Sequence, residues 1–169
     1  MLTGIRTIAV WAAILAVWLF AGRAHAQNSA NAQPGLLAFW SAGLSHATKL
    51  GEVDWSKYSG VTTQREIAWD VTDDPFYPDG PVDNFAARFV GFIDVPRNGA
   101  WTFGLASDSG ARLTIDGTVV INDDANHSFR RTTGKISLKQ GRYPVEIRYL
   151  EIADGSLVTW GDASSGGDS

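Results

Sequence analysis

The segment from Ser107 to Gly110 reads Ser-Asp-Ser-Gly, three small side chains that carry oxygen atoms followed by a glycine. Hydroxyl and carboxylate oxygens accept backbone N–H hydrogen bonds in tight turns, and glycine readily adopts the positive φ that many turns need. The same oxygens are ligands of hard cations such as calcium. Two interpretations therefore stay open: a simple turn between strands, or a turn that holds a cation and a ligand.

The residues after this segment predict the elements that position it. Residues 111–115 alternate apolar and polar side chains, as in a strand with one buried face. The pair Asp116-Gly117 separates them from a second apolar run at 118–122. Because both central residues of the favoured two-residue turn need positive φ, this pair predicts a β-hairpin.

Short strand-like segments with turn residues between them extend along the rest of the chain, and no helical pattern interrupts them. This spacing predicts an all-β fold, an antiparallel β-sandwich or barrel. Residues 123–134 are expected to form a loop. The further strands are expected at 36–40, 63–71, 85–95, 100–107, 135–138, 142–151 and 157–160. Four tryptophans in these contexts are expected in the core: Trp40, Trp69, Trp101 and Trp160.

The N-terminus has the pattern of a secretory signal peptide at 1–26. Arg6 precedes a mostly apolar, uncharged run at 7–22, and Ala24-His25-Ala26 fits a small-x-small cleavage site. We expect cleavage after Ala26, export to the periplasm or the cell exterior, and no membrane span afterwards; an uncleaved anchor is the alternative. The rest divides into a polar lead-in at 27–33, a folded domain at 34–160 and a disordered Gly/Ser-rich tail at 161–169.

Charge and cysteine content restrict the classes of function. The chain has 169 residues, a formal net charge of −4 and no cysteine. A negative chain has no general attraction for nucleic acid, which we exclude as a partner, or for anionic lipid. Without disulfides, an exported domain depends on its apolar core, with a bound metal as a further source of stability.

Six spaced elements carry a resemblance to a known family. They are Gly91-Phe92, the turn 96–99, Trp101-Thr102-Phe103, the segment 107–110, the hairpin 112–117 and the late strand 141–151. Their order resembles the PA-fourteen domain, a β-sandwich named after a bacterial toxin's protective antigen. The resemblance covers roughly residues 34–160. It implies a β-sandwich of PA-fourteen type, found in adhesins, glycosidases, glycosyltransferases and toxins.

The resemblance also implies a ligand. Where one is established for the family, it is usually carbohydrate bound through calcium, and in fungal adhesins two adjacent aspartates joined by a cis peptide hold the ion. Asp108 matches the first aspartate and Ser109 stands in place of the second, which implies a weakened calcium site. Further oxygens would come from the following loop if it folds over the turn. The expected metal ligands are Asp108, Ser109, Asp123 and Asp124, and the expected carbohydrate-binding residues are Asp108, Ser109, Asp123 and Asn126.

We therefore expect an exported, non-catalytic carbohydrate-binding or adhesive module whose partner is a glycan or cell-surface polysaccharide. One alternative is a structural or protein-interaction domain of the cell envelope with an envelope protein as its partner. Another is a glycoside hydrolase or its accessory domain. The sequence contains neither G-x-S-x-G nor H-E-x-x-H, so no catalytic residue is predicted. His127 is expected on the surface, and Glu151 is expected to hold a loop by hydrogen bonds.

Overall fold

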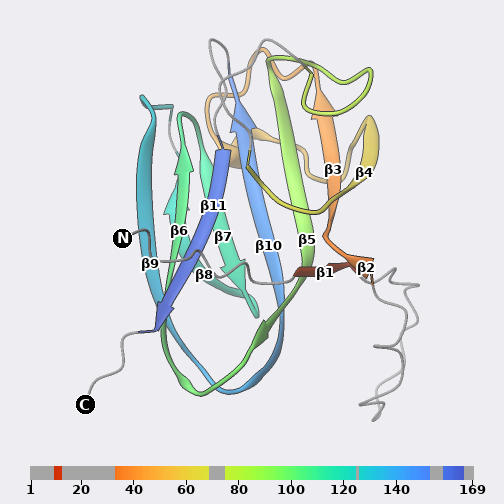
Figure 1. Cartoon of the computed structure of the whole chain (residues 1–169). Helices are drawn as coiled ribbons and strands as arrows, with labels where there is room; N and C mark the ends of the chain where they lie inside the picture. Colours follow the sequence, from red (N-terminus) through yellow and green to blue (C-terminus); the bar gives the residue numbers. More distant parts are fainter. Residues whose placement is uncertain (1–9, 13–32, 69–74, 125, 153–157, 166–169) are drawn as a thin grey trace, which may run out of the picture.

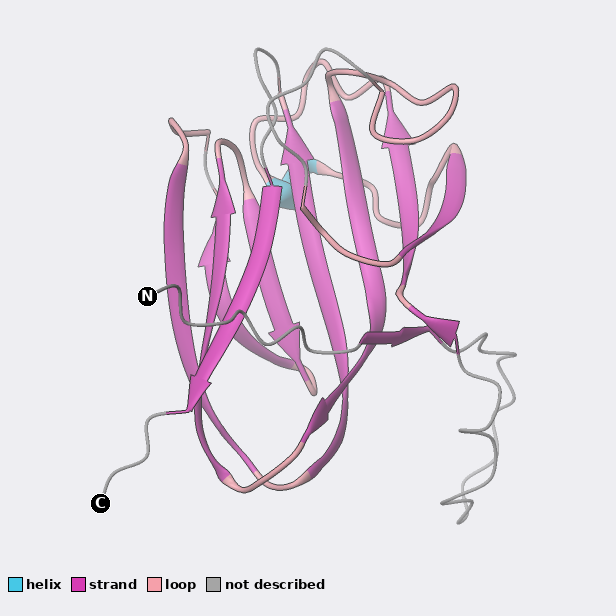
Figure 2. Ribbon diagram, in the orientation of Figure 1, coloured by secondary structure: helices cyan, strands magenta, loops and turns pink. Residues whose placement is uncertain are grey.

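The protein is almost entirely β-structure in the computed structural model, which describes residues 10–12, 33–68, 75–124, 126–152 and 158–165 (Figures 1 and 2). Apart from one short 3-10 helix, Leu50–Glu52, the elements are strands: β1 Val10–Ala12, β2 Gln33–Pro34, β3 Leu36–Ala42, β4 Gly60–Gln64, β5 Phe85–Val95, β6 Gly99–Ser107, β7 Ala111–Ile115, β8 Thr118–Asp123, β9 Arg130–Leu138, β10 Gly141–Glu151 and β11 Val158–Ser165.

Two sheets form the sandwich. The larger sheet has the strand order β2-β1-β5-β10-β7-β8. Strand β3 also pairs with β5, and β4 pairs with β3. The smaller sheet has the order β11-β6-β9. Every strand pair among the described residues is antiparallel. In Figure 1, β9, β6 and β11 lie together on one side of the molecule, and β5, β10 and β3 lie on the other. The expected all-β, antiparallel sandwich is confirmed.

The core lies between the sheets and is rich in aromatic rings. Trp40 is fully buried, and its ring is 4.8 Å from Tyr77, 5.8 Å from Phe85 and 5.7 Å from Phe89, measured between centroids. Its indole N–H donates to the Thr62 hydroxyl at 2.8 Å, so the large apolar ring is buried without loss of a hydrogen bond. Trp101 is also buried, as expected.

A second, smaller cluster covers part of the outer face of the large sheet. Ala86 of β5 and Leu150 of β10 face outward and pack against Leu50 and Val53 of the segment between β3 and β4. The Trp55 indole N–H donates to the Leu50 carbonyl at 3.0 Å, which links two parts of this segment.

The structure confirms some of the local elements expected from the sequence and corrects the bounds of others. The Asp116-Gly117 hairpin is confirmed, with φ of 49° and 75°. The strand expected at 63–71 is wrong in its bounds, because β4 pairs with β3 only from Gly60 to Gln64. The loop expected at 123–134 is too long, since β9 already begins at Arg130.

The ends of the chain are described only in part. β11 continues past the expected domain end at 160 and pairs with β6 as far as Ser165, so residues 161–165 belong to the sheet. Trp69 lies outside the described residues. β1 falls within the expected signal peptide and pairs with β2 and β5; the rest of that segment lies outside the described residues, and its cleavage stays a prediction. No helix in the described part of the chain is both long and apolar enough to cross a membrane.

The two sheets approach closely where β8 and β9 meet, and this contact requires a glycine. A Cβ atom at Gly134 would overlap the backbone carbonyl of Val120. Gly134→Ala is therefore expected to lower the free energy of unfolding by about 1–3 kcal/mol, the usual cost of overpacking, as measured by urea unfolding.

Gly51→Ala is the matched control, since nothing lies within 4 Å of the atom it would add. Equal stability of the Gly134→Ala and wild-type proteins would contradict the close approach of β8 to β9.

Candidate functional site

The segment 107–110 is a turn that crosses one end of the sandwich, from β6 in the small sheet to β7 in the large sheet. The Ser107 hydroxyl donates to the Ser109 carbonyl at 2.9 Å, and the Leu150 N–H of β10 donates to the Gly110 carbonyl at 2.9 Å. Ser107 and Ser109 are buried, whereas Asp108 is only half-buried. Asp108 is therefore the charged group of this turn that solvent reaches.

Tyr149 holds the Asp108 carboxylate from inside the core. Its side chain is fully buried on β10, with its ring 6.1 Å from that of Phe85. Its hydroxyl lies 3.2 Å from Asp108 Oδ1 and makes a shorter hydrogen bond to Glu151 Oε2. Glu151 is itself 1% exposed. One phenolic proton thus lies between two carboxyl groups that come from different elements.

Burial raises the pKa of Tyr149 far above its ordinary value, and the neighbouring charges of Glu151 and Asp108 add to the effect. The hydroxyl is therefore a permanent donor at physiological pH. Its one proton is shared between Glu151 and Asp108 Oδ1, so this contact favours one orientation of the Asp108 carboxylate, and no donor from the described residues reaches the other Asp108 oxygen. The site offers one oriented carboxylate oxygen at the end of the sandwich.

The loop between β8 and β9 lies beside this turn. Asp123 pairs with Ala111 in the large sheet, and Arg130 pairs with Ser107 in the small sheet, so the loop and the turn share one end of the sandwich. Whether these loop residues share a site with Asp108 stays a prediction. Asn126 is exposed in the same loop.

The Asp123 carboxylate, at the end of β8, is engaged by side chains of β9. Arg130 donates to it through Nε at 3.0 Å and through Nη2, and the Thr132 hydroxyl donates at 2.6 Å. The Arg130 hydrogen bond is the main cause that lowers the pKa of Asp123, although burial of this 7% exposed side chain opposes it. Its negative charge is neutralised by an arginine.

Asp124 connects the loop to a different part of the chain. Its Oδ1 accepts the Leu50 N–H of the 3-10 helix, and its Oδ2 lies 3.5 Å from Arg112 Nη2. His127 is not on the surface as expected: its side chain is 8% exposed, and its Nε2 lies 3.3 Å from Asp123 Oδ2. His127 of the loop therefore contacts Asp123 at the end of β8.

The expected calcium ligands are thus at one end of the molecule but have separate partners. Within the described residues, no group of three or more acidic or histidine side chains could hold a metal, and no peptide bond is cis, including 108–109. The buried Ser109 lies in a turn whose charged member is Asp108. As a donor set, one accessible carboxylate and neutral oxygens fit calcium poorly, and calcium binding stays a prediction.

Tyr149 was not anticipated as part of the site. Its signal in the sequence is faint: Tyr149 and Glu151 are two residues apart on one strand and so share a face. That face also carries the apolar Ile147, which marks it as inward. Tyr149 and Glu151 are polar residues on a buried face, so they need hydrogen-bond partners. Asp108 of the turn is one such partner, for Tyr149. Glu151 accepts a hydrogen bond from Tyr149 on its own strand, and the expectation that it holds a loop stays a prediction.

Comparison with known proteins gives a family and a fold. A family model described as the PA14 domain matches residues 33–166, and none of the curated proteins matches the chain. Similar solved structures include an anti-sigma factor domain-containing protein from Clostridium clariflavum (20% identity, TM-score 0.64), the PA14 domain of the MpAFP antifreeze protein (15%, 0.67) and the PA14 sugar-binding domain from an RTX adhesin (16%, 0.65).

The three alignments cover 78%, 85% and 78% of this chain, and 42%, 90% and 93% of the other chains, in the same order. The chain therefore spans less than half the length of the Clostridium clariflavum protein. At these identities the likeness concerns the fold.

The Asp123 ion pair predicts an acid-sensitive contribution to stability. The pKa of Asp123 is lowered in the folded protein, so its stabilisation is present above the ordinary value of 3.8 and is lost as the pH falls through the folded value. Asp123→Asn is expected to lower the free energy of unfolding by about 1–3 kcal/mol at pH 7, and by less near pH 3, in urea unfolding at each pH.

Asp94→Asn is the control, because Asp94 pairs with Arg142 but its side chain is 46% exposed. Exposed pairs contribute about 0–1 kcal/mol. A loss for Asp123→Asn that is small or independent of pH would contradict the role of the Arg130 contact.

Proposed function

The chain belongs to the PA14 domain family, which confirms the resemblance seen in its sequence, and on that premise we propose that it is a non-catalytic carbohydrate-binding or adhesive module. Its sugar site is the end of the sandwich around Asp108. The proposal places the module outside the cytoplasm, in agreement with the expected signal peptide. The PA14 sugar-binding domain of the RTX adhesin, with a similar fold, supports the ligand class.

One observation carries the proposal: the half-buried Asp108 carboxylate, oriented by the buried Tyr149, with one oxygen not engaged by the described residues. Sugar hydroxyls donate well to ionised carboxylates, and such charge-assisted bonds are roughly twice as strong as neutral ones. A carboxylate that is already held in place loses little conformational freedom when a ligand binds. The Asp108 carboxylate can therefore accept hydrogen bonds from sugar hydroxyls and is already oriented before a sugar binds.

Calcium enters the proposal as a weakly held ion. When bound, it would add a positive centre that sugar hydroxyls can also coordinate. Asp108 would be its charged ligand and Ser109 a neutral one. Asp123 and Asp124 already bind arginines, so each would have to give up a partner to join the ion. The proposed affinity is low for that reason, and direct contact of sugar with Asp108 remains available without the ion.

Asp108→Asn is expected to abolish or weaken glycan binding by at least about tenfold, since the amide keeps the shape of the side chain but removes its charge. The measurement is binding of wild type and variant to an array of neutral mono- and oligosaccharides in calcium buffer. Unchanged binding by Asp108→Asn, or no binding by the wild type, would overturn the site and favour a structural role, in which Asp108 serves only as a partner for Tyr149.

Asp116→Asn is the matched control. It removes the same charge from the exposed hairpin at the opposite end of β7, and asparagine tolerates the positive φ found there. Its glycan binding is expected to equal that of the wild type.

The calcium proposal has its own test. At a hundredfold excess over Kd, a ligand of the folded state adds about 2.7 kcal/mol of stability. We expect a small rise in Tm with millimolar calcium relative to chelator, a larger rise in Ser109→Asp, which supplies a second carboxylate, and none in Asp108→Asn. The same calcium response in all three proteins would place any bound ion elsewhere.

A further inference from the structure

Three arginines form a row across the outer face of the large sheet. Arg148 of β10 lies directly opposite Arg88 of β5 on one side and opposite Arg112 of β7 on the other. Residues in direct register point to the same face, and adjacent strands are about 4.8 Å apart, so the three Cα atoms lie within about 10 Å. These arginines alternate along their strands with buried core residues, which places the row outside the sandwich.

Such a row costs stability unless its charges are compensated, because like charges directly opposite one another repel. Part of the compensation is visible. Glu146 accepts from Arg148 Nε at 2.7 Å and lies 3.5 Å from Arg88 Nε, and Asp124 lies 3.5 Å from Arg112 Nη2. The negative charges of two carboxylates therefore compensate only part of the positive charge of the three guanidinium groups.

Aromatic rings hold two of the guanidinium groups in place. Arg88 lies 5.0 Å from the centre of the Phe39 ring, and Arg148 lies 4.9 Å from that of Trp55. Stacking of this kind orients the planar group and leaves its edge free to donate. The arginine side chains are 26–31% exposed.

Most of the donors in the row are not used. A guanidinium has five N–H groups, yet the contacts of Arg88 and Arg148 with carboxylates are made through Nε alone. Their Nη nitrogens have no acceptor among the described residues and are not among the buried polar atoms, so they reach solvent. Paired N–H groups of this type match the two oxygens of a carboxylate.

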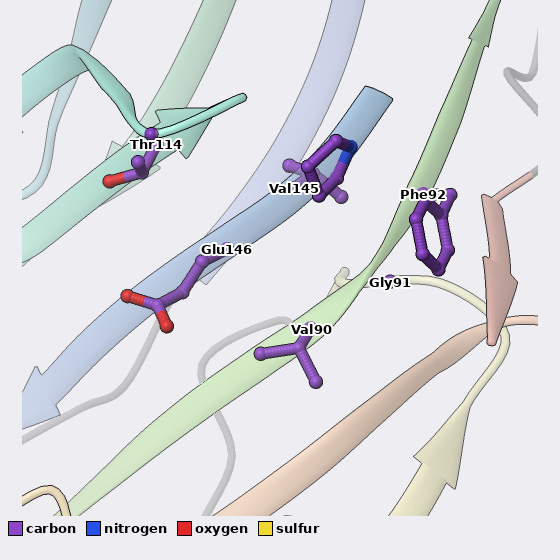
Figure 3. A pocket seen from close by; sticks show the side chains of 8 residues that line it. Val90, Gly91, Phe92, Thr114, Val145 and Glu146 are labelled. Carbon is purple, nitrogen blue, oxygen red and sulfur yellow. The ribbon is translucent and has the colours of Figure 1, made fainter. Parts of the chain in front are cut away.

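A shallow groove of about 320 Å³ runs beside the row on the same three strands. Figure 3 shows Val90 on β5, Glu146 on β10 and Thr114 on β7 along it, with Phe92 at one end. The lining is mainly apolar, and the charge of Glu146 is neutralised by its arginine partners. An apolar floor beside a few oriented polar groups is the usual composition of a site for a ring-shaped ligand.

We propose that this outer face is a second binding surface, and that its ligand is a polysaccharide carrying carboxylate groups. The sugar rings lie in the groove against Phe92 and Val90, and their carboxylates bind the free Nη groups of the arginine row. The negative net charge of the chain does not prevent this, because charges farther away than about 8 Å are screened at physiological salt. The surface is separate from Asp108 and does not depend on the proposed function of that site.

The test uses polygalacturonate as the probe and its fully methyl-esterified form as the neutral polymer of the same backbone. Wild-type protein is expected to bind the acidic polymer, to bind the esterified polymer much more weakly, and to lose affinity as salt increases. Arg112→Gln and Arg148→Gln together are expected to weaken binding by at least about tenfold.

Arg142→Gln is the matched control. Arg142 lies on the same strand and face, but its guanidinium is engaged by both oxygens of Asp94, at 2.7 and 2.9 Å. The Arg142→Gln substitution removes the same charge and should leave the binding of polygalacturonate unchanged. The Asp108→Asn substitution should also leave it unchanged. Arg112→Gln alone, which leaves the Trp55 stack intact, is measured as well, with Tm recorded for every variant.

Three results would overturn the proposal: no binding of polygalacturonate by the wild type, equal binding of the esterified polymer, or an equal loss of affinity in Arg142→Gln and the row variants. Loss in Asp108→Asn but not in the row variants would assign the acidic polymer to the other site. Binding of neutral glycans at Asp108 can fail while polygalacturonate still binds the row, so the two proposals are distinguished.

Discussion

The candidate site depends on one requirement of the core, the hydrogen bond of the buried Tyr149 hydroxyl. The ring belongs to the aromatic packing between the sheets, where it meets Phe85. A hydroxyl at that depth must find an acceptor, because an unpaired one costs about 1–3 kcal/mol. It finds Glu151 on its own strand and Asp108 on the turn. The packing of the core thereby sets the position of the only acid in the 107–110 turn.

Strand β10 connects the two surfaces for which we propose functions. Its inward residues, Ile147 and Tyr149, pack in the core and hold the turn, while its outward residues, Glu146 and Arg148, lie in the arginine row and its groove. The period of two along a strand separates the two sets. β10 pairs along β5 and β7, so both surfaces are connected to a central strand of the large sheet.

The acids of the β8–β9 loop show how ion pairs compete with metal binding. Asp123 and Asp124 have the chemistry of calcium ligands, but they pair with Arg130 and Arg112, and within the described residues no third acid or histidine completes a metal-binding group with them. The ion pairs join these acids to β9 and β7, and the Leu50 N–H bond to Asp124 joins them to the 3-10 helix. A domain without disulfides gains order at this end from such contacts.

Local patterns in the sequence determined most of the fold. Alternation in 85–95 and 111–115 and the pair Asp116-Gly117 defined strands and a hairpin without reference to the rest of the chain, and the spacing of the family motifs identified the sandwich. Weaker local patterns misplaced β4 and the start of β9, because pairing with β3 and β6 sets those bounds.

The partners of charged side chains were decided by the tertiary structure. The sequence marked Asp108, Asp123 and Asp124 as acids of one site, but it did not show that Tyr149 holds the first and arginines hold the others. Nor did it show that Arg88, Arg112 and Arg148 share one row. Strand propensity acts between neighbours in the chain, whereas an ion pair or a cross-strand row joins residues whose distance is set only when the sheets have paired and packed.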